Sequence, residues 1–271
     1  MTPSDAAPRP DEHDEHDEDA RLAARLAAEA ARLAHRMRAE GLETRHKTSV
    51  SDVVTAADHA AEDLVRDRLR AERPDDAILG EEHGTVAGSS GRTWLVDPVD
   101  GTYNFVSGLP WWCSAVALRD GEDLVLGAVH DPVADATYVG GPGLTPTRDG
   151  VPLEPLVDRA LASTCAATYL HPPLHDTEVG AAWRRAVGGL ATVRVLGSMS
   201  MDSLAVATGR VGVLFGHSVA PWDELPGAAI IRGVGGVTRH VEAGGVDWYV
   251  AGAPTAVAEV CAALRGEPRD R

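Results

Sequence analysis

The 271-residue chain carries 41 acidic and 25 basic side chains, which gives a formal net charge of -16 at pH 7. This surplus argues against general binding of nucleic acid phosphates or anionic membranes, since both need clustered Lys and Arg. No apolar run reaches the roughly 18 to 20 residues of a membrane span, and the acidic start is unlike a signal peptide. Three cysteines, far apart among apolar neighbours, are typical of a reducing compartment, so we expect a cytoplasmic protein.

The first half of the chain is predicted to form helices and then mostly consecutive strands. Residues 1–18, rich in Asp, Glu and His, are expected to be a disordered acidic tail. The hydrophobic periodicity and the positions of Gly and Pro predict helices over 19–40 and 56–72 and strands over 77–80, 93–96, 114–118, 124–129 and 137–139. Residues 19–150 therefore form an α+β part with an antiparallel sheet.

The second half, residues 151–271, alternates between strand-like and helix-like patterns and is expected to be an α/β part. Strands are predicted over 161–165, 192–196, 211–215 and 248–251, and helices over 178–187, 199–208, 224–232 and 255–265. The change of pattern follows a stretch rich in Gly, Pro and Asp, which we take as the boundary between the two parts.

Four acidic residues each follow or interrupt an apolar stretch: Glu81, Asp97, Asp100 and Asp223. A buried carboxylate must be paired or bound to a cation, and these segments offer few Lys or Arg partners. Hard divalent cations such as Mg²⁺ prefer oxygen ligands and usually keep waters that a substrate phosphate can replace. The pattern therefore predicts a Mg²⁺ site at strand ends.

The stretch WLVDPVDGTYNF at 94–105 holds two of these acids on what we expect to be a stiff turn, because Pro98 restricts its own φ and the preceding residue. Gly101 permits close backbone approach, and the amides after it could hold a phosphate. The acids lack the spacing of an aspartyl nucleophile pair, and the loop lacks the ligand pattern of an EF-hand. Mg²⁺ ions bound to such acids can activate a water for in-line displacement at phosphorus.

Five segments resemble the signatures of the inositol monophosphatase family. They are SDVVTAAD at 51–58, GEE at 80–82, WLVDPVDGTYNF at 94–105, RVLGSMSMDSLAVATGR at 194–210 and PWDELPGAAIIRGVGG at 221–236. The resemblance covers about residues 21–266 and implies a layered α-β-α-β-α sandwich like that of inositol monophosphatase and fructose bisphosphatase. It places most metal ligands in the part 19–150, with 151–271 completing the active site.

The resemblance also implies a ligand set. Glu81, Asp97 and the backbone carbonyl of Val99 would bind a first Mg²⁺, and Asp97, Asp100 and Asp223 a second, with two or three ions per site. It further implies a homodimer and inhibition by Li⁺.

For the reaction itself, the resemblance assigns Asp58 and Thr102 to orienting the attacking water, together with Glu81. The amides of Gly101 and Thr102 would meet the phosphate, and Lys47 matches a family lysine. The substrate contacts that it implies are Val99, Asp100, Gly101, Thr102, Gly197, Ser198, Met199, Gly216 and Asp223.

The pocket for the leaving group departs from the family pattern. Gly216 stands where the family commonly places an acidic residue for a sugar or inositol hydroxyl, and Met199 is bulkier than the small residue expected nearby. Thr168 is expected to line the same pocket. These differences leave the substrate open among inositol phosphate, other polyol or sugar phosphates, histidinol phosphate, fructose bisphosphate and nucleotide bisphosphates.

We therefore expect a Mg²⁺-dependent phosphomonoesterase acting on a small phosphorylated metabolite, with no nucleic acid or membrane partner. A different class of function is a metal-binding regulatory protein that keeps the fold without turnover. The presence of Asp58 and Thr102 beside every metal ligand favours the enzyme, because a protein that only binds metal has no need to orient water.

Overall fold

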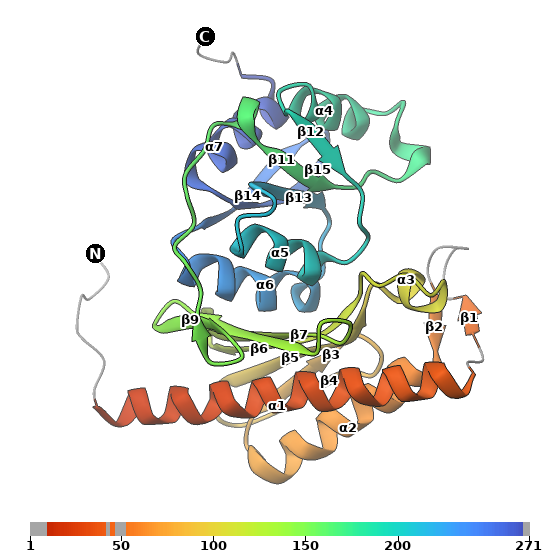
Figure 1. Ribbon diagram of the computed structural model, residues 1–271, viewed down its shortest axis with the longest axis vertical. Helices are drawn as coiled ribbons and strands as arrows, with labels where there is room; N and C mark the ends of the chain where they lie inside the picture. Colours follow the sequence, from red (N-terminus) through yellow and green to blue (C-terminus); the bar gives the residue numbers. More distant parts are fainter. Residues whose placement is uncertain (1–9, 42–43, 47–52, 268–271) are drawn as a thin grey trace.

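The computed structural model describes residues 10–41, 44–46 and 53–267, which fold into five stacked layers (Figure 1). Helices α1 (Pro10–Glu40) and α2 (Ala56–Glu72) cover the outer face of a large sheet, and α4 (Glu178–Val187) and α7 (Pro254–Arg265) cover the outer face of a smaller one. Helices α5 (Met199–Ala207) and α6 (Pro221–Gly233) lie between the two sheets. The layered α-β-α-β-α sandwich expected from the sequence is confirmed.

The large sheet has eight strands, and every neighbouring pair is antiparallel except β3 and β5. Its order is β10 (Val151–Pro152), β9 (Leu144–Arg148), β8 (Ala136–Gly141), β7 (Asp123–Asp131), β6 (Cys113–Asp120), β5 (Arg92–Asp100), β3 (Ala77–Gly80) and β4 (Gly84–Val86). The parallel pair brings the ends of β3 and β5 to the same edge, with Gly80 opposite Val96.

The smaller sheet has five strands and is mixed. Its order is β12 (Thr192–Arg194), β11 (Cys165–Thr168), β13 (Val213–His217), β15 (Val246–Gly252) and β14 (Val237–Ala243), in which the first three are parallel. The remaining short elements are β1 (Thr44–His46), β2 (Val53–Thr55), α3 (Thr102–Val106) and two 3₁₀ turns, η1 (Leu161–Ser163) and η2 (Pro172–Leu174).

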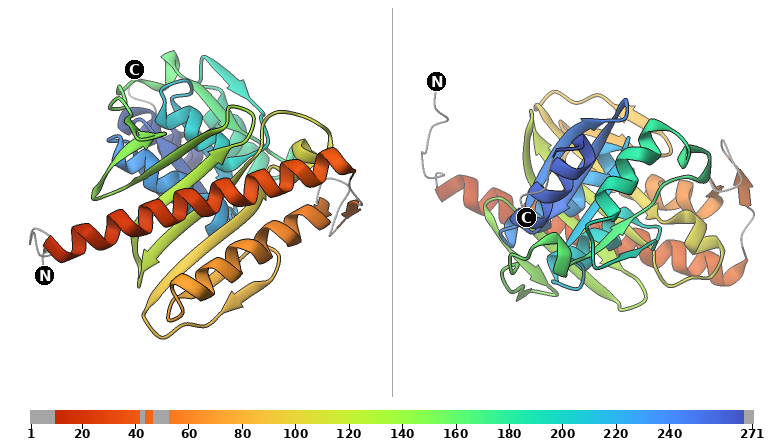
Figure 2. Two further views of the ribbon diagram at one scale, coloured as in Figure 1. Left: turned by 60° about the horizontal axis from the view of Figure 1, so that its bottom comes forward. Right: turned by 90° about the horizontal axis from the view of Figure 1, so that it is seen from above.

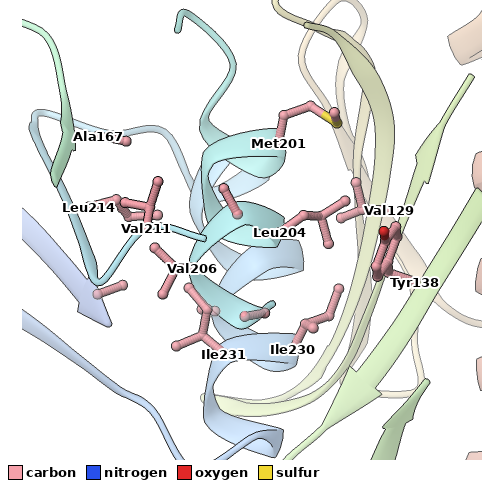
Figure 3. Packing of buried hydrophobic residues seen from close by; sticks show 14 of the residues in the cluster. Val129, Tyr138, Ala167, Met201, Leu204, Val206, Val211, Leu214, Ile230 and Ile231 are labelled. Atoms are coloured by element: carbon pink, nitrogen blue, oxygen red, sulfur yellow. The ribbon is translucent and has the colours of Figure 1, made fainter. Parts of the chain in front are cut away.

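The central core lies where α5 and α6 pack between the sheets (Figure 3). Leu204 and Ile230 point from the two helices toward Val129 and Tyr138 of the large sheet, while Val206 lies on the side of the smaller sheet. Because these helices are buried on both sides, their apolar residues are not confined to one stripe. This packing joins the two halves of the chain over a shared interior.

The outer helices α1 and α2 lie side by side across the large sheet (Figure 2). The buried face of α1 is rich in alanine, which allows the helix to approach the sheet closely. Asp19 on this face is fully buried and accepts hydrogen bonds from Arg73 and Arg92, so its charge is compensated. Within the described residues, no helix combines the length and apolar composition that a membrane span requires.

Most predicted elements are present, but three differences have physical causes. The expected disordered tail is wrong for residues 10–18, which are helical; Pro10 begins α1, where its fixed φ suits a first turn. Residues 1–9 lie outside the described part. The strand expected over 161–165 is instead a 3₁₀ turn followed by β11, and β14 was missed because its sequence VTRHVEA mixes charged with apolar residues.

Candidate active site

A bulge in β5 places the two aspartates of the DPVD stretch on the same side of the large sheet. In a regular strand, residues three apart point to opposite faces. Here Asp97 pairs with Ala115 and Asp100 with Cys113, so two residues of β5 oppose one of β6. Val96 and Val99 accordingly both pack toward α1 and α2, which leaves Asp97 and Asp100 facing the interior between the sheets.

Asp97, Asp100 and Asp223 converge, since each offers a carboxylate oxygen within 4.8 Å of the others. Asp97 and Asp100 are buried, with 1% and 5% of their surface exposed. Burial, followed by the charges of Glu81, Asp100 and Asp223, raises the pKa of Asp97 well above its ordinary value. Burial and the charge of Asp100 raise the pKa of Asp223 to about 7. Such mutual repulsion fits a site for a divalent cation.

The second half of the chain holds Asp100 in place. The first turn of α5 donates backbone hydrogen bonds to this carboxylate, from Met199 N to Oδ1 at 3.1 Å and from Ser200 N to Oδ2 at 2.5 Å. Ser198 caps the same helix by accepting a hydrogen bond from Met201 N. Burial raises the pKa of Asp100, and the bonds from Ser200 oppose that rise.

Glu81 directly follows β3, and its backbone N donates to the carbonyl of Val96 at 3.2 Å. Glu81 therefore lies beside Asp97 on the neighbouring strand, close enough for its charge to raise the pKa of Asp97. Glu81 is not among the three residues whose carboxylate oxygens lie within 4.8 Å of one another. The structure thus brings Glu81 next to the cluster without making it part of the tight group.

Asp58 and Thr102 meet beside the cluster. Asp58 is the third residue of α2, where it forms a reciprocal capping box with Thr55. Its Oδ2 accepts hydrogen bonds from the backbone N and hydroxyl of Thr55 at 3.0 and 2.5 Å, and its Oδ1 lies 3.2 Å from the Thr102 hydroxyl. The same hydroxyl lies 3.0 Å from the carbonyl of Val99. Burial raises the pKa of Asp58, against the effect of the Thr55 bonds.

A model of the inositol monophosphatase family matches residues 15–266. The chain belongs to the inositol monophosphatase family. It is 34% identical over 195 residues to inositol monophosphatase 1 of Solanum lycopersicum, covering 69% of this chain and 71% of the relative. This confirms the family and the enzyme class predicted from the sequence, phosphoric monoester hydrolases.

Two further relatives carry the name SuhB. The chain is 31% identical over 230 residues to the Nus factor SuhB of Escherichia coli strain K12, covering 81% of this chain and 85% of the relative. The solved structure of Mycobacterium tuberculosis SuhB matches with a TM-score of 0.77 at 32% identity, covering 92% of this chain and 96% of that one.

A pocket of about 340 Å³ opens next to the cluster of this family member, and Asp223 lines it. Its other lining residues include Thr168, Gly197, Ser198, Met199 and Gly216, all expected near the substrate from the sequence. The Cε of Met199 lies 3.1 Å from the position that a Cβ on Gly216 would take. Met199 therefore occupies the space that a side chain at 216 would enter.

Gly101 lies where the two halves of the chain pack closely against each other. Its φ of 92° is one that side chains disfavour, and a Cβ there would approach Ser198 Cβ and the carbonyl of Trp111 to 3.0 Å. Asn104 then ties the same turn to the other half by donating to the carbonyl of Leu196 at 2.7 Å, and it also donates to the carbonyl of Trp111 at 2.8 Å. The turn that follows the aspartates is thus fixed by both sides.

Sequence reasoning missed several residues that support this site, among them Asn104, Asp202 and Glu62. Asp202 is 8% exposed, lines the pocket and accepts a hydrogen bond from Trp111 Nε1 at 2.8 Å. The one signal in the sequence for this role is that Asp202 lies one turn into the helix predicted after Ser198. Lys47, which the resemblance singled out, lies outside the described residues.

Proposed function

We propose that this protein is a Mg²⁺-dependent phosphomonoesterase that hydrolyses a small polyol, inositol or sugar phosphate with a metal-activated water. The observation that carries the proposal is the convergence of Asp97, Asp100 and Asp223 beside the Asp58–Thr102 pair. The first group suits cation binding, and the second offers a carboxylate and a hydroxyl at one point. Together they offer a place for the metal and a group that can accept a proton from the water, as metal-assisted hydrolysis uses.

In this proposal the site holds two or three Mg²⁺ ions, with Glu81, Asp97 and the Val99 carbonyl at one and Asp97, Asp100 and Asp223 at the next. All of these groups are oxygen donors, which Mg²⁺ prefers. When bound, the metal would supply Lewis-acid chemistry, lowering the pKa of a water and neutralising phosphate oxygens.

The residues of the chain orient the reaction. Asp58 accepts a hydrogen bond from Thr102, so the pair can hold a water in line with the phosphorus and receive its proton. The water oxygen forms the new bond to phosphorus as the bond to the leaving oxygen breaks, and that oxygen takes up a proton. The amides of Gly101 and Thr102 would hold the phosphate, with Gly197 and Ser198 facing it from the other half.

The pocket favours a substrate with a single phosphate. None of the described residues lining it is Lys or Arg, whereas Asp202 and Asp223 are acidic. A second phosphate would find no Lys or Arg among these lining residues and would lie near the Asp202 carboxyl, which disfavours fructose bisphosphate and nucleotide bisphosphates. Relatives named inositol-1-monophosphatase support inositol phosphate as a candidate, and histidinol phosphate is the alternative with one phosphate.

A second candidate function is regulatory, because a relative in Escherichia coli is named a Nus factor. Such a role needs a partner surface and no turnover. The Asp58–Thr102 contact favours catalysis, since it serves no purpose in metal binding alone. The cytoplasmic location and the homodimer remain predictions.

The proposal is tested by measuring phosphate release with and without Mg²⁺ over a panel of substrates. The panel contains inositol 1-phosphate, a sugar monophosphate, histidinol phosphate, fructose 1,6-bisphosphate and adenosine 3',5'-bisphosphate. We expect Mg²⁺-dependent release from at least one monophosphate and slower release from both bisphosphates. No release from any compound would leave the regulatory candidate.

A further inference from the structure

A buried carboxylate on α2 forms hydrogen bonds with the turn that follows Glu81. Glu62 has no exposed surface, and its side chain accepts hydrogen bonds from Glu82 N at 2.7 Å and His83 N at 3.1 Å. Both amides belong to the residues that directly follow Glu81. Burying this charge without partners would be costly, and the two backbone N–H groups offset that cost by hydrogen bonding to the carboxylate.

Arg66, one helical turn later, binds both Glu62 and the same turn. Its guanidinium donates to Glu62 Oε1 at 3.1 Å and to the carbonyl of Gly84 at 3.0 Å. Arg66 is only 6% exposed, so this ion pair is screened little by water. The pair therefore fixes three successive residues of the turn, 82 to 84, to the body of α2.

The residue before Glu81 leaves room for this contact. A Cβ on Gly80 would lie 2.1 Å from Glu62 Oε1, so the position of the Glu62 carboxylate requires glycine at 80. On its other side, Gly80 pairs with Val96 of β5, next to Asp97. Glu81 thus lies between two fixed neighbours: Gly80, which is paired with β5, and the turn at 82 to 84, which is bound by Glu62 and Arg66.

The same helix also carries Asp58, four residues before Glu62. Residues four apart lie on one face of a helix, so this face of α2 serves both the turn after β3 and the Thr102 contact. A shift of α2 would move both together.

We propose that Glu62 and Arg66 are positioning residues that hold Glu81 in place to bind the metal. The inference rests on the proposed role of Glu81 as a metal ligand. Neither residue faces the cluster itself: they act through the backbone of residues 82 to 84. Outer partners of this kind typically change metal affinity by about 10- to 100-fold when they are removed.

The test compares Glu62→Gln with Glu72→Gln. Both changes convert a carboxylate on α2 that is paired with an arginine, but Glu72 pairs with Arg25 in an exposed position away from the turn. Mg²⁺ affinity of the chelator-treated protein is measured by titration calorimetry without substrate, and amide exchange at residues 82 and 83 by NMR. For Glu62→Gln we expect the Kd for Mg²⁺ to rise about 10-fold or more and both amides to exchange faster.

Glu72→Gln should match the wild type in both measurements. An unchanged Kd in Glu62→Gln would overturn the inference, even if exchange becomes faster.

Should Glu62→Gln fail to fold by circular dichroism, Arg66→Lys decides, because it keeps the charge but cannot bridge Glu62 and Gly84 in the same way. A raised Kd supports the inference, and an unchanged Kd overturns it. Absence of Mg²⁺ binding in the wild type would overturn this inference and the proposed metal chemistry together, whereas Mg²⁺ binding without hydrolysis would refute only the proposed activity.

Discussion

At the scale of single residues, the hydroxyl of Thr102 allows the proposed catalytic role to be tested without removing a carboxylate of the cluster. It contacts Asp58 and the Val99 carbonyl but is not one of the converging carboxylates. Thr102→Val keeps the side-chain shape and removes the hydrogen bond. We expect kcat at saturating Mg²⁺ to fall about 100-fold, since proton-handling groups contribute about 10²- to 10⁴-fold.

Steady-state kinetics at saturating Mg²⁺ measure this effect. Thr208→Val is the control, because the Thr208 hydroxyl bonds to carbonyls of its own helix. A kcat equal to that of the control would contradict the assignment of Thr102.

Gly216 is the residue at which substrate choice is tested. A Cβ there would lie 3.1 Å from Met199 Cε, the end of a flexible side chain that can move, and 3.4 Å from Val219 Cγ2, an ordinary contact distance. Gly216→Glu, made together with Met199→Ala, should raise the preference for inositol 1-phosphate over glycerol 2-phosphate by about 10-fold, the value of one charged hydrogen bond. The ratio of the two kcat/KM values is measured, and an unaltered ratio argues against this pocket as the site of the leaving group.

At the scale of elements, the turn from β5 into α3 links the two halves of the molecule. Gly101→Ala places a side chain at a φ of 92° and against the carbonyl of Trp111. We expect a loss of about 1–3 kcal/mol in the free energy of unfolding, together with weaker Mg²⁺ binding, because Asp100 must move. Urea unfolding and calorimetry measure the two effects.

Gly209→Ala is the matched control for this change. Gly209 also has a positive φ, 71°, but a Cβ there would meet no atom within 4 Å. It should lose stability through backbone strain alone and keep its Mg²⁺ affinity. Equal behaviour of the two variants would show that the contacts around Gly101 do not matter.

Much of this fold could be predicted from local sequence, and the limits lie where distant segments meet. The bounds of α2, β3 and α4 follow from periodicity, Gly and Pro alone. The bulge in β5 could not be predicted, because it depends on the register with β6; the sequence indicated only a stiff turn at these aspartates. Glu62 reads in sequence as an ordinary helix acid, and only the folded turn shows what it binds.

At the scale of the whole molecule, the acidic cluster makes the stability of the metal-free protein depend on pH. The pKa of Asp223 is raised from 3.8 to about 7 in the folded state. Between these values the folded chain holds a proton that the unfolded chain has released, so stability falls as pH rises through this range.

In the presence of a chelator, we therefore expect the urea midpoint of the wild type to fall between pH 5 and pH 8, and Asp223→Asn to show a smaller fall. Added Mg²⁺ should restore the wild type at pH 8, because a ligand that binds only the folded state stabilises it. Identical pH profiles of the two proteins would refute the assigned shift.

The central claim, that the acidic cluster holds the metal that drives phosphoester hydrolysis, is tested most directly with Asp100→Asn. This change removes one charge, and one of the two backbone donors in the first turn of α5 can still bond to the amide oxygen. Phosphate release from the best substrate is measured at saturating Mg²⁺, with circular dichroism to verify folding. We predict a loss of more than about 100-fold, beyond the effect typical of residues that only support a ligand. A folded variant with nearly wild-type turnover would contradict the claim.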